Sequence, residues 1–181
     1  MGGGCKNVSG GVPCHYKSLN DRFRRMFEAG RYAQALVAFE RAGRSREARI
    51  CNAYVLQEKA ALISTTAGTA RVQAFVTAAK AFLKGVLDSP SKERLTCYEA
   101  AGDCYKEARD LKRAADNYQL AEKYDKAALA YMERGCIDEM VEVINQHKRT
   151  FSSSVHEQLT TAAQTHYFKV HFNCPLVSRH L

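Results

Sequence analysis

The chain has 181 residues, 46% of them hydrophobic and 25% charged, and a net charge of +8 at pH 7. These values are ordinary for a globular protein and exclude a wholly disordered or fibrous chain. With only three prolines and eleven glycines, few residues interrupt helices. No apolar run approaches the roughly 18 residues that a membrane span needs, so no membrane partner is expected.

The N-terminal residues 1–17 contain five glycines and one proline without hydrophobic periodicity, which predicts a flexible leader. They lack the apolar core of a secretory signal peptide. Position 6 is Lys6, where the myristoylation pattern requires Ser or Thr. The seven cysteines are odd in number and scattered, which does not suit a disulfide framework. We therefore expect an intracellular protein, cytoplasmic or nuclear.

Helical periodicity begins near Leu19 and continues through most of the chain. It predicts four helices before residue 90, over Leu19 to Gly30, Tyr32 to Ala42, Arg44 or Ser45 to about Ser64, and about Ala70 to Leu87. Ser89 is expected to cap the next helix, with Pro90 at its first position.

The segment from Tyr98 to His147 repeats internally every thirteen residues. Each unit has an apolar residue, a small residue three positions later and a large one seven positions later, all on one helical face. A unit of this length allows a helix of about ten residues and a tight turn, so consecutive helices run antiparallel. The registers are Tyr98, Leu111, Tyr124 and Ile137; Ala101, Ala114, Ala127 and Met140; and Tyr105, Tyr118, Tyr131 and Ile144, with an earlier unit at Tyr32, Ala35 and Phe39.

The pattern predicts an all-α fold over residues 18–150, in which short antiparallel helical hairpins stack as an α-solenoid. From Arg94 to Glu122 the sequence resembles the tetratricopeptide repeat, except that Arg109 stands where that repeat usually has glycine and no closing proline follows Ala121. The residues predicted to pack the repeats together are Tyr98, Ala101, Gly102, Tyr105, Ala114, Tyr118, Ala121, Ala127 and Tyr131.

A narrower resemblance covers about Leu19 to His147. The strings AFERAGRSREARICNAYVLQEKA, FVTAAKAFLKG and YEAAGDCYKEARDLKRAADNYQLAEKYDKAALAYMERG resemble the helical region of large fungal proteins that carry a UvrD-type helicase-like domain, relatives of the animal tetratricopeptide-and-ankyrin-repeat protein. The resemblance implies a helical array without its motor, because the chain has no G-x-x-x-x-G-K-[ST] phosphate loop.

The C-terminal part departs from the repeat at Phe151 to Ser154. One more helical stripe then predicts a capping helix over 151–170; it consists of Val155, Leu159, Ala162, Ala163, His166 and Val170. Residues 171–181 have no helical period and are predicted to form a loose tail.

Catalytic and metal-binding patterns are weak. His166, His171, Cys174 and His180 do not form the two close ligand pairs that structural zinc sites use, so no metal is predicted. Cys104 has no histidine in its repeat unit and is expected to pack as a small hydrophobe. We expect no catalytic residue, no cofactor and no enzymatic activity.

Two functions from different classes remain open. The first is a protein-interaction scaffold that binds a peptide or helix in a groove, where Lys106 and Arg109 meet acidic groups of the partner. The second is an accessory nucleic-acid-binding fragment of a helicase-like protein, which would use the basic segment 22–49. Its candidate phosphate contacts are Arg22, Arg24, Arg25 and Arg31. We prefer the scaffold, because the basic segment lacks interleaved aromatics and the chain has no recognisable nucleic-acid fold.

Overall fold

The fold is known from a computed structural model that describes residues 25–87 and 89–172, without the side chains of 171 and 172. Within these residues the regular structure is helical and contains no strand, which confirms the all-α prediction. After a helical turn at 25–28, the helices are α2 (Tyr32–Arg41), α3 (Ser45–Leu62), α4 (Gly68–Val86), α5 (Ser91–Glu107), α6 (Leu111–Leu120), α7 (Tyr124–Arg134), α8 (Ile137–Gln146) and α9 (Ser153–Phe172).

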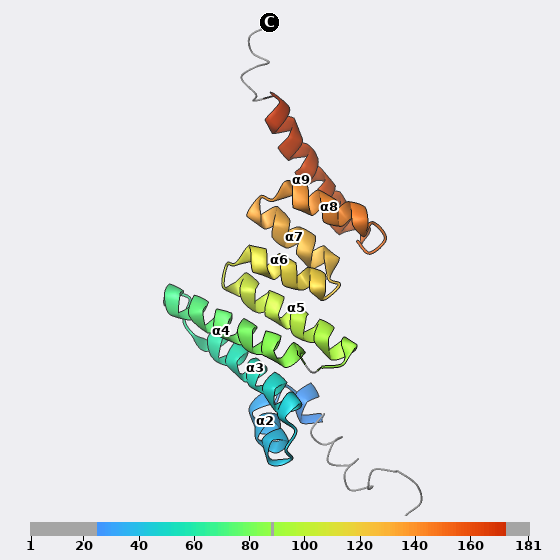
Figure 1. Cartoon of the computed structure of the whole chain (residues 1–181). Coiled ribbons are helices and arrows are strands. Elements are labelled where there is room, and N and C mark those ends of the chain that lie inside the picture. The colour runs from blue at the N-terminus through green and yellow to red at the C-terminus, as the bar shows by residue number, and fades with distance from the viewer. Residues whose placement is uncertain (1–24, 88, 173–181) are drawn as a thin grey trace, which may run out of the picture.

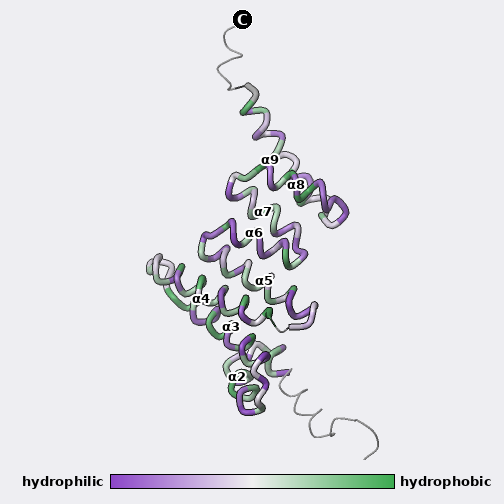
Figure 2. The backbone as a smooth tube through the Cα atoms, viewed as in Figure 1, coloured by the Kyte–Doolittle hydropathy of each residue, from purple (hydrophilic) through white to green (hydrophobic). Residues whose placement is uncertain are grey.

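The helices are arranged in chain order. Each helix packs on the next one in the sequence, and α9 also contacts α7. Figure 1 shows α2 near one end of the stack and α9 at the other, with short turns that reverse the chain between consecutive helices. Figure 2 shows hydrophobic and hydrophilic residues alternating along each helix, as expected when one stripe faces neighbouring helices.

Five turns share one backbone conformation. In the turn after α5, Arg109 is left-handed and Asp110 N–H donates to the Tyr105 carbonyl at 2.9 Å, which is the Schellman arrangement. Arg109 thus adopts the backbone conformation that glycine adopts most readily. The left-handed residues follow the thirteen-residue spacing: Gly30 and Gly43 near the N-terminus, then Arg109, Glu122 and Gly135.

The core follows the same spacing. One register of small or flexible residues is fully buried, and the register of large residues four positions later is also buried. Gly102 lies against the Tyr118 ring, so closely that a Cβ at Gly102 would stand 2.7 Å from ring carbons. The fully buried register is Ala35, Ala101, Ala114, Ala127 and Met140; the large register is Phe39, Tyr105, Tyr118, Tyr131 and Ile144.

The start of α5 differs from the prediction. Ser89 does not cap this helix; its hydroxyl donates to the Gly85 carbonyl of α4 at 2.6 Å. The cap position belongs to Pro90, which provides no side-chain hydrogen bond. The reason is that α4 ends next to Ser89 and leaves carbonyl groups without helical partners, which the hydroxyl reaches.

Other boundaries shift by a few residues. Helix α4 spans Gly68–Val86, against the predicted Ala70 to Leu87, and α9 spans Ser153–Phe172, against the predicted 151–170. The predicted leader 1–17, the predicted start of the first helix at Leu19 and most of the predicted tail 171–181 lie outside the described residues. Among the helices of the described part, none is long and apolar enough to cross a membrane.

Candidate partner-binding cleft

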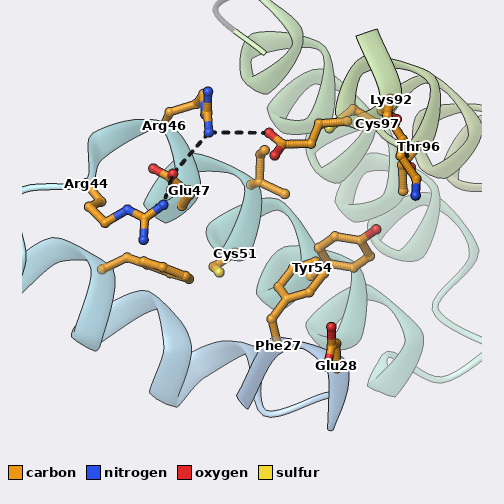
Figure 3. Close-up of a pocket in the computed structure, with 13 residues that line it drawn as sticks. Phe27, Glu28, Arg44, Arg46, Glu47, Cys51, Tyr54, Lys92, Thr96 and Cys97 are labelled. Atoms are coloured by element: carbon orange, nitrogen blue, oxygen red, sulfur yellow. Dashed lines mark hydrogen bonds and ion pairs between the residues drawn. The ribbon is translucent and has the colours of Figure 1, made fainter. Parts of the chain in front are cut away.

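A cleft of about 660 Å³ lies between residues 25–28, the first half of α3 and the first turns of α5 (Figure 3). Ligand pockets typically have volumes of this order. Phe39 of α2 lines it as well, so the cleft needs four separate segments of the sequence and exists only when these helices pack together. It has an apolar floor of Phe27, Phe39, Ile50, Cys51, Tyr54 and Cys97, and a polar rim of Glu28, Arg44, Arg46, Glu47, Lys92, Glu93 and Thr96.

Aromatic contacts fix the floor. The Tyr54 ring meets Phe27 edge-on at 5.2 Å between centroids, stacks on Tyr32 at 4.5 Å and meets Phe82 edge-on at 4.8 Å. These rings join residues 25–28, α2, α3 and α4. Burial raises the pKa of the Cys51 and Cys97 thiols to about 11, so both are protonated at neutral pH and contribute apolar surface.

Ion pairs order the rim. Glu47 accepts hydrogen bonds from Arg44 and, at 3.1 Å, from Arg46. Burial alone would raise the pKa of Glu47, but the Arg44 hydrogen bond and the two arginine charges outweigh it and lower that pKa. Arg46 Nη2 also faces Glu93 Oε2 of α5 at 3.6 Å, so the rim joins two helices. With Glu28 and Lys92, the lining has three acidic and three basic residues, and the charges balance.

Lys106 and Arg109, the predicted partner contacts, do not line this cleft. Both are exposed, near the C-terminal end of α5 and in the turn that follows. The cleft lies at the other end of that helix, at Lys92 and Glu93, about 21 Å away along the axis. The structure therefore places the two predicted partner contacts away from this cleft.

The basic segment 22–49 is partly neutralised. Arg44 and Arg46 pair with Glu47, so these two charges are not available to phosphate without a cost. Arg25 and Arg31 are exposed, at the same end of the molecule as the cleft. The other two predicted phosphate contacts, Arg22 and Arg24, lie outside the described residues.

The residues predicted to pack the repeats lie in the core, except Tyr98, which is half-buried. Two tyrosines make the same contact one repeat apart. Tyr118 donates to Asp103 at 2.8 Å, and Tyr131 donates to Asp116 at 3.4 Å. Lys126 of α7 reaches Asp103 at 3.1 Å and Glu99 at 2.9 Å, which ties α7 to α5.

Cys104 is fully buried, and burial raises the pKa of its thiol to about 12. No group of three or more His, Cys, Asp or Glu side chains in the described part of the chain is placed to hold a metal ion. Of the four tail residues considered for zinc, only the side chain of His166 is described.

Sequence analysis missed the residues that make the cleft. Arg46 was counted only within a basic excess, and Glu93 and Tyr54 were not singled out. One signal was present: Arg44 and Arg46 lie at the start of a helix, where the positive end of the helix dipole disfavours cations. Glu47, in the same helix, offsets the positive charge of these arginines. Glu93 belongs to α5, and sequence spacing does not predict its contact with Arg46.

Comparisons with protein-family models, with curated proteins and with solved structures found no match to this chain. The resemblances to tetratricopeptide repeats and to helicase-linked helical regions therefore stay predictions. The function has to be inferred from the chemistry of the chain's own residues.

Proposed function

We propose that the chain is a non-enzymatic protein-interaction scaffold, a tetratricopeptide-like α-solenoid that binds a peptide or helix of a partner. The observation that carries this proposal is the cleft between residues 25–28, α3 and α5, with its apolar floor and balanced rim. Cys51, Cys97, Cys104 and Cys136 are free thiols, which suits a reducing intracellular compartment, cytoplasmic or nuclear.

The floor and the rim have different tasks in this proposal. Apolar side chains of a partner gain free energy by leaving water for the Phe27, Ile50 and Tyr54 surface. The charged rim orients the bound segment and rejects groups that leave its charges unpaired. Because the floor is apolar and the rim neutral, binding should depend only weakly on salt.

The test uses the immobilised full chain and a phage library of random twelve-residue peptides. Peptides enriched on the wild-type chain are measured again on Thr96→Trp, which places an indole at the rim of the cleft. Thr77→Trp is the matched control, because Thr77 is also an exposed helical threonine whose hydroxyl donates to the carbonyl four residues earlier. We expect Thr96→Trp to abolish binding and Thr77→Trp to preserve it. Enriched peptides that bind both variants equally would contradict the cleft as the site.

The alternative is nucleic-acid binding through the exposed arginines at the N-terminal end. Its probe is a fluorescein-labelled random-sequence RNA or DNA strand, titrated at 50 and 500 mM salt. Phosphate contacts predict a steep loss of affinity with salt and a further loss when Arg22, Arg24, Arg25 and Arg31 are changed to Glu. The scaffold predicts weak binding to this probe that these changes leave unaltered.

A further inference from the structure

Among the described residues, two polar atoms beside the cleft lack hydrogen-bond partners. Arg46 Nε is a donor and Glu93 Oε2 an acceptor, and both are shielded from water. The two side chains form an ion pair through another arginine nitrogen, Arg46 Nη2 to Glu93 Oε2 at 3.6 Å, which is too long for a hydrogen bond. An unsatisfied donor of α3 and an unsatisfied acceptor of α5 thus belong to one loose ion pair at the junction of the two helices.

The two side chains remain reachable from the cleft. The Arg46 side chain is 31% exposed and the Glu93 side chain 45%, and both line the cleft. Rotation about their side-chain torsions turns the unsatisfied atoms toward a bound group without moving either helix. Arg46 also lies in the first turn of α3, a position that the helix dipole disfavours for a cation. Its contacts with Glu47 and Glu93 offset this cost.

The chemistry of the pair selects one class of side chain. A carboxylate would be repelled by Glu93, and an ammonium or guanidinium group would be repelled by Arg46. A primary carboxamide offers an oxygen acceptor and an N–H donor on the same side, one for each partner. The C=O and N–H of one trans peptide group point to opposite sides, so a single backbone amide does not offer this pair.

We infer that the cleft binds a peptide through an asparagine or glutamine whose carboxamide contacts both Arg46 and Glu93 from the cleft side, with a neighbouring apolar side chain on the Phe27 and Tyr54 floor. This inference rests on the proposed function and adds the class of ligand. The carboxamide oxygen accepts from Arg46, and its N–H donates to Glu93. Hydrogen bonds to charged groups are stronger than neutral ones, so this contact dominates specificity.

The test uses the full chain and the library peptides that Thr96→Trp blocks. We expect these peptides to share an asparagine or glutamine, and its change to leucine or to the matching acid to weaken binding about tenfold or more. The chain variants Arg46→Met and Glu93→Gln should bind the original peptide about tenfold more weakly and no longer distinguish it from the leucine peptide. Glu107→Gln is the control, because Glu107 pairs with Arg71 between α4 and α5 outside the cleft.

Circular dichroism melts establish that each variant folds. Peptides that Thr96→Trp blocks but that tolerate loss of the carboxamide would overturn this inference and leave the proposed function standing. Wild-type binding by Arg46→Met and Glu93→Gln would overturn it in the same way, because neither side chain would then contribute to holding the carboxamide. A library that yields no peptide blocked by Thr96→Trp would overturn both proposals.

Discussion

At the scale of single residues, Gly102 sets how closely α5 and α6 approach. A Cβ there would lie 2.7 Å from carbons of the Tyr118 ring, which is buried and held by its hydrogen bond to Asp103. The ring has no room to retreat, since the protein interior is close-packed. Glycine at this position is therefore a requirement of packing.

Gly102→Ala should destabilise the protein by about 1–3 kcal/mol, because overpacking outweighs the gain in helix propensity. Gly68→Ala is the control, since Gly68 also lies in a helix but a Cβ there meets nothing within 4 Å. Urea unfolding followed by circular dichroism measures both. Equal stability of the two variants would show that α5 and α6 move apart at no cost to accommodate the added methyl group.

Glu99 gives a residue-scale prediction about acid. Burial alone would raise its pKa, but the hydrogen bond from Lys126 and the charges of Lys126 and Lys123 outweigh it and lower the pKa in the folded chain. The ionised Glu99 thus stabilises the fold above its ordinary pKa of 4.5, and this contribution is lost as pH falls through the lower folded value. Glu99→Gln should lower Tm at pH 7 and show a smaller further drop between pH 5 and pH 3. The same change at exposed Glu133 should leave the wild-type drop intact.

At the scale of elements, the repeated turn keeps its shape whatever residue occupies it. Arg109 and Glu122 have φ values of 62° and 58°, close to those of the glycines at equivalent positions. The left-handed conformation costs a residue with a side chain about 1 kcal/mol or more. The packing of the helices on both sides of the turn therefore outweighs the preference of Arg109 and Glu122 for a negative φ.

Arg109→Gly and Glu122→Gly should each stabilise the chain by up to about 1 kcal/mol, because glycine adopts this backbone without strain. Gly135→Ala should have the opposite effect, since Gly135 has a φ of 82°. Lys112→Gly, inside α6, controls for flexibility and should destabilise by about 1 kcal/mol. Thermal unfolding measures the stability of the four variants. If Arg109→Gly and Glu122→Gly both destabilised the chain, the side chains of Arg109 and Glu122 would be stabilising the turns.

Much of the fold could be predicted from the sequence at this scale. The thirteen-residue registers identify residues that the structure buries, such as Ala101, Ala114 and Tyr118. Tight turns between antiparallel helices follow from the same spacing. The cleft could not be predicted, because it needs Phe27, Tyr54 and Glu93 to converge from segments far apart in the chain, and no periodicity links them. Ser89 was assigned to the wrong helix because a capping motif does not show which helix end competes for the hydroxyl.

At the scale of the whole molecule, packing joins neighbours in the chain and leaves the two ends apart. Helix α2 packs on α3, while α9 packs on α8 and α7. In a chain connected in this way the stability of each helix depends mainly on the helices beside it. A destabilising change should therefore affect its own helix and its neighbours more than distant helices.

Met140→Ala should reveal this locality, since Met140 is fully buried in α8. Truncating such a side chain costs about 2–5 kcal/mol. Hydrogen exchange should accelerate in α7, α8 and α9 and stay unchanged in α2 and α3. Acceleration throughout the chain would mean that the helices unfold as one unit.

The most direct test of the central claim is hydrogen–deuterium exchange of the full chain with and without a library peptide that Thr96→Trp blocks. The claim is that the stacked helices create a peptide-binding cleft from residues 25–28, α3 and α5. Bound peptide should slow exchange at 25–28, in the first half of α3 and in the first turns of α5. Protection confined to the turn around Lys106 and Arg109, or absent from α3 and α5, would contradict the claim.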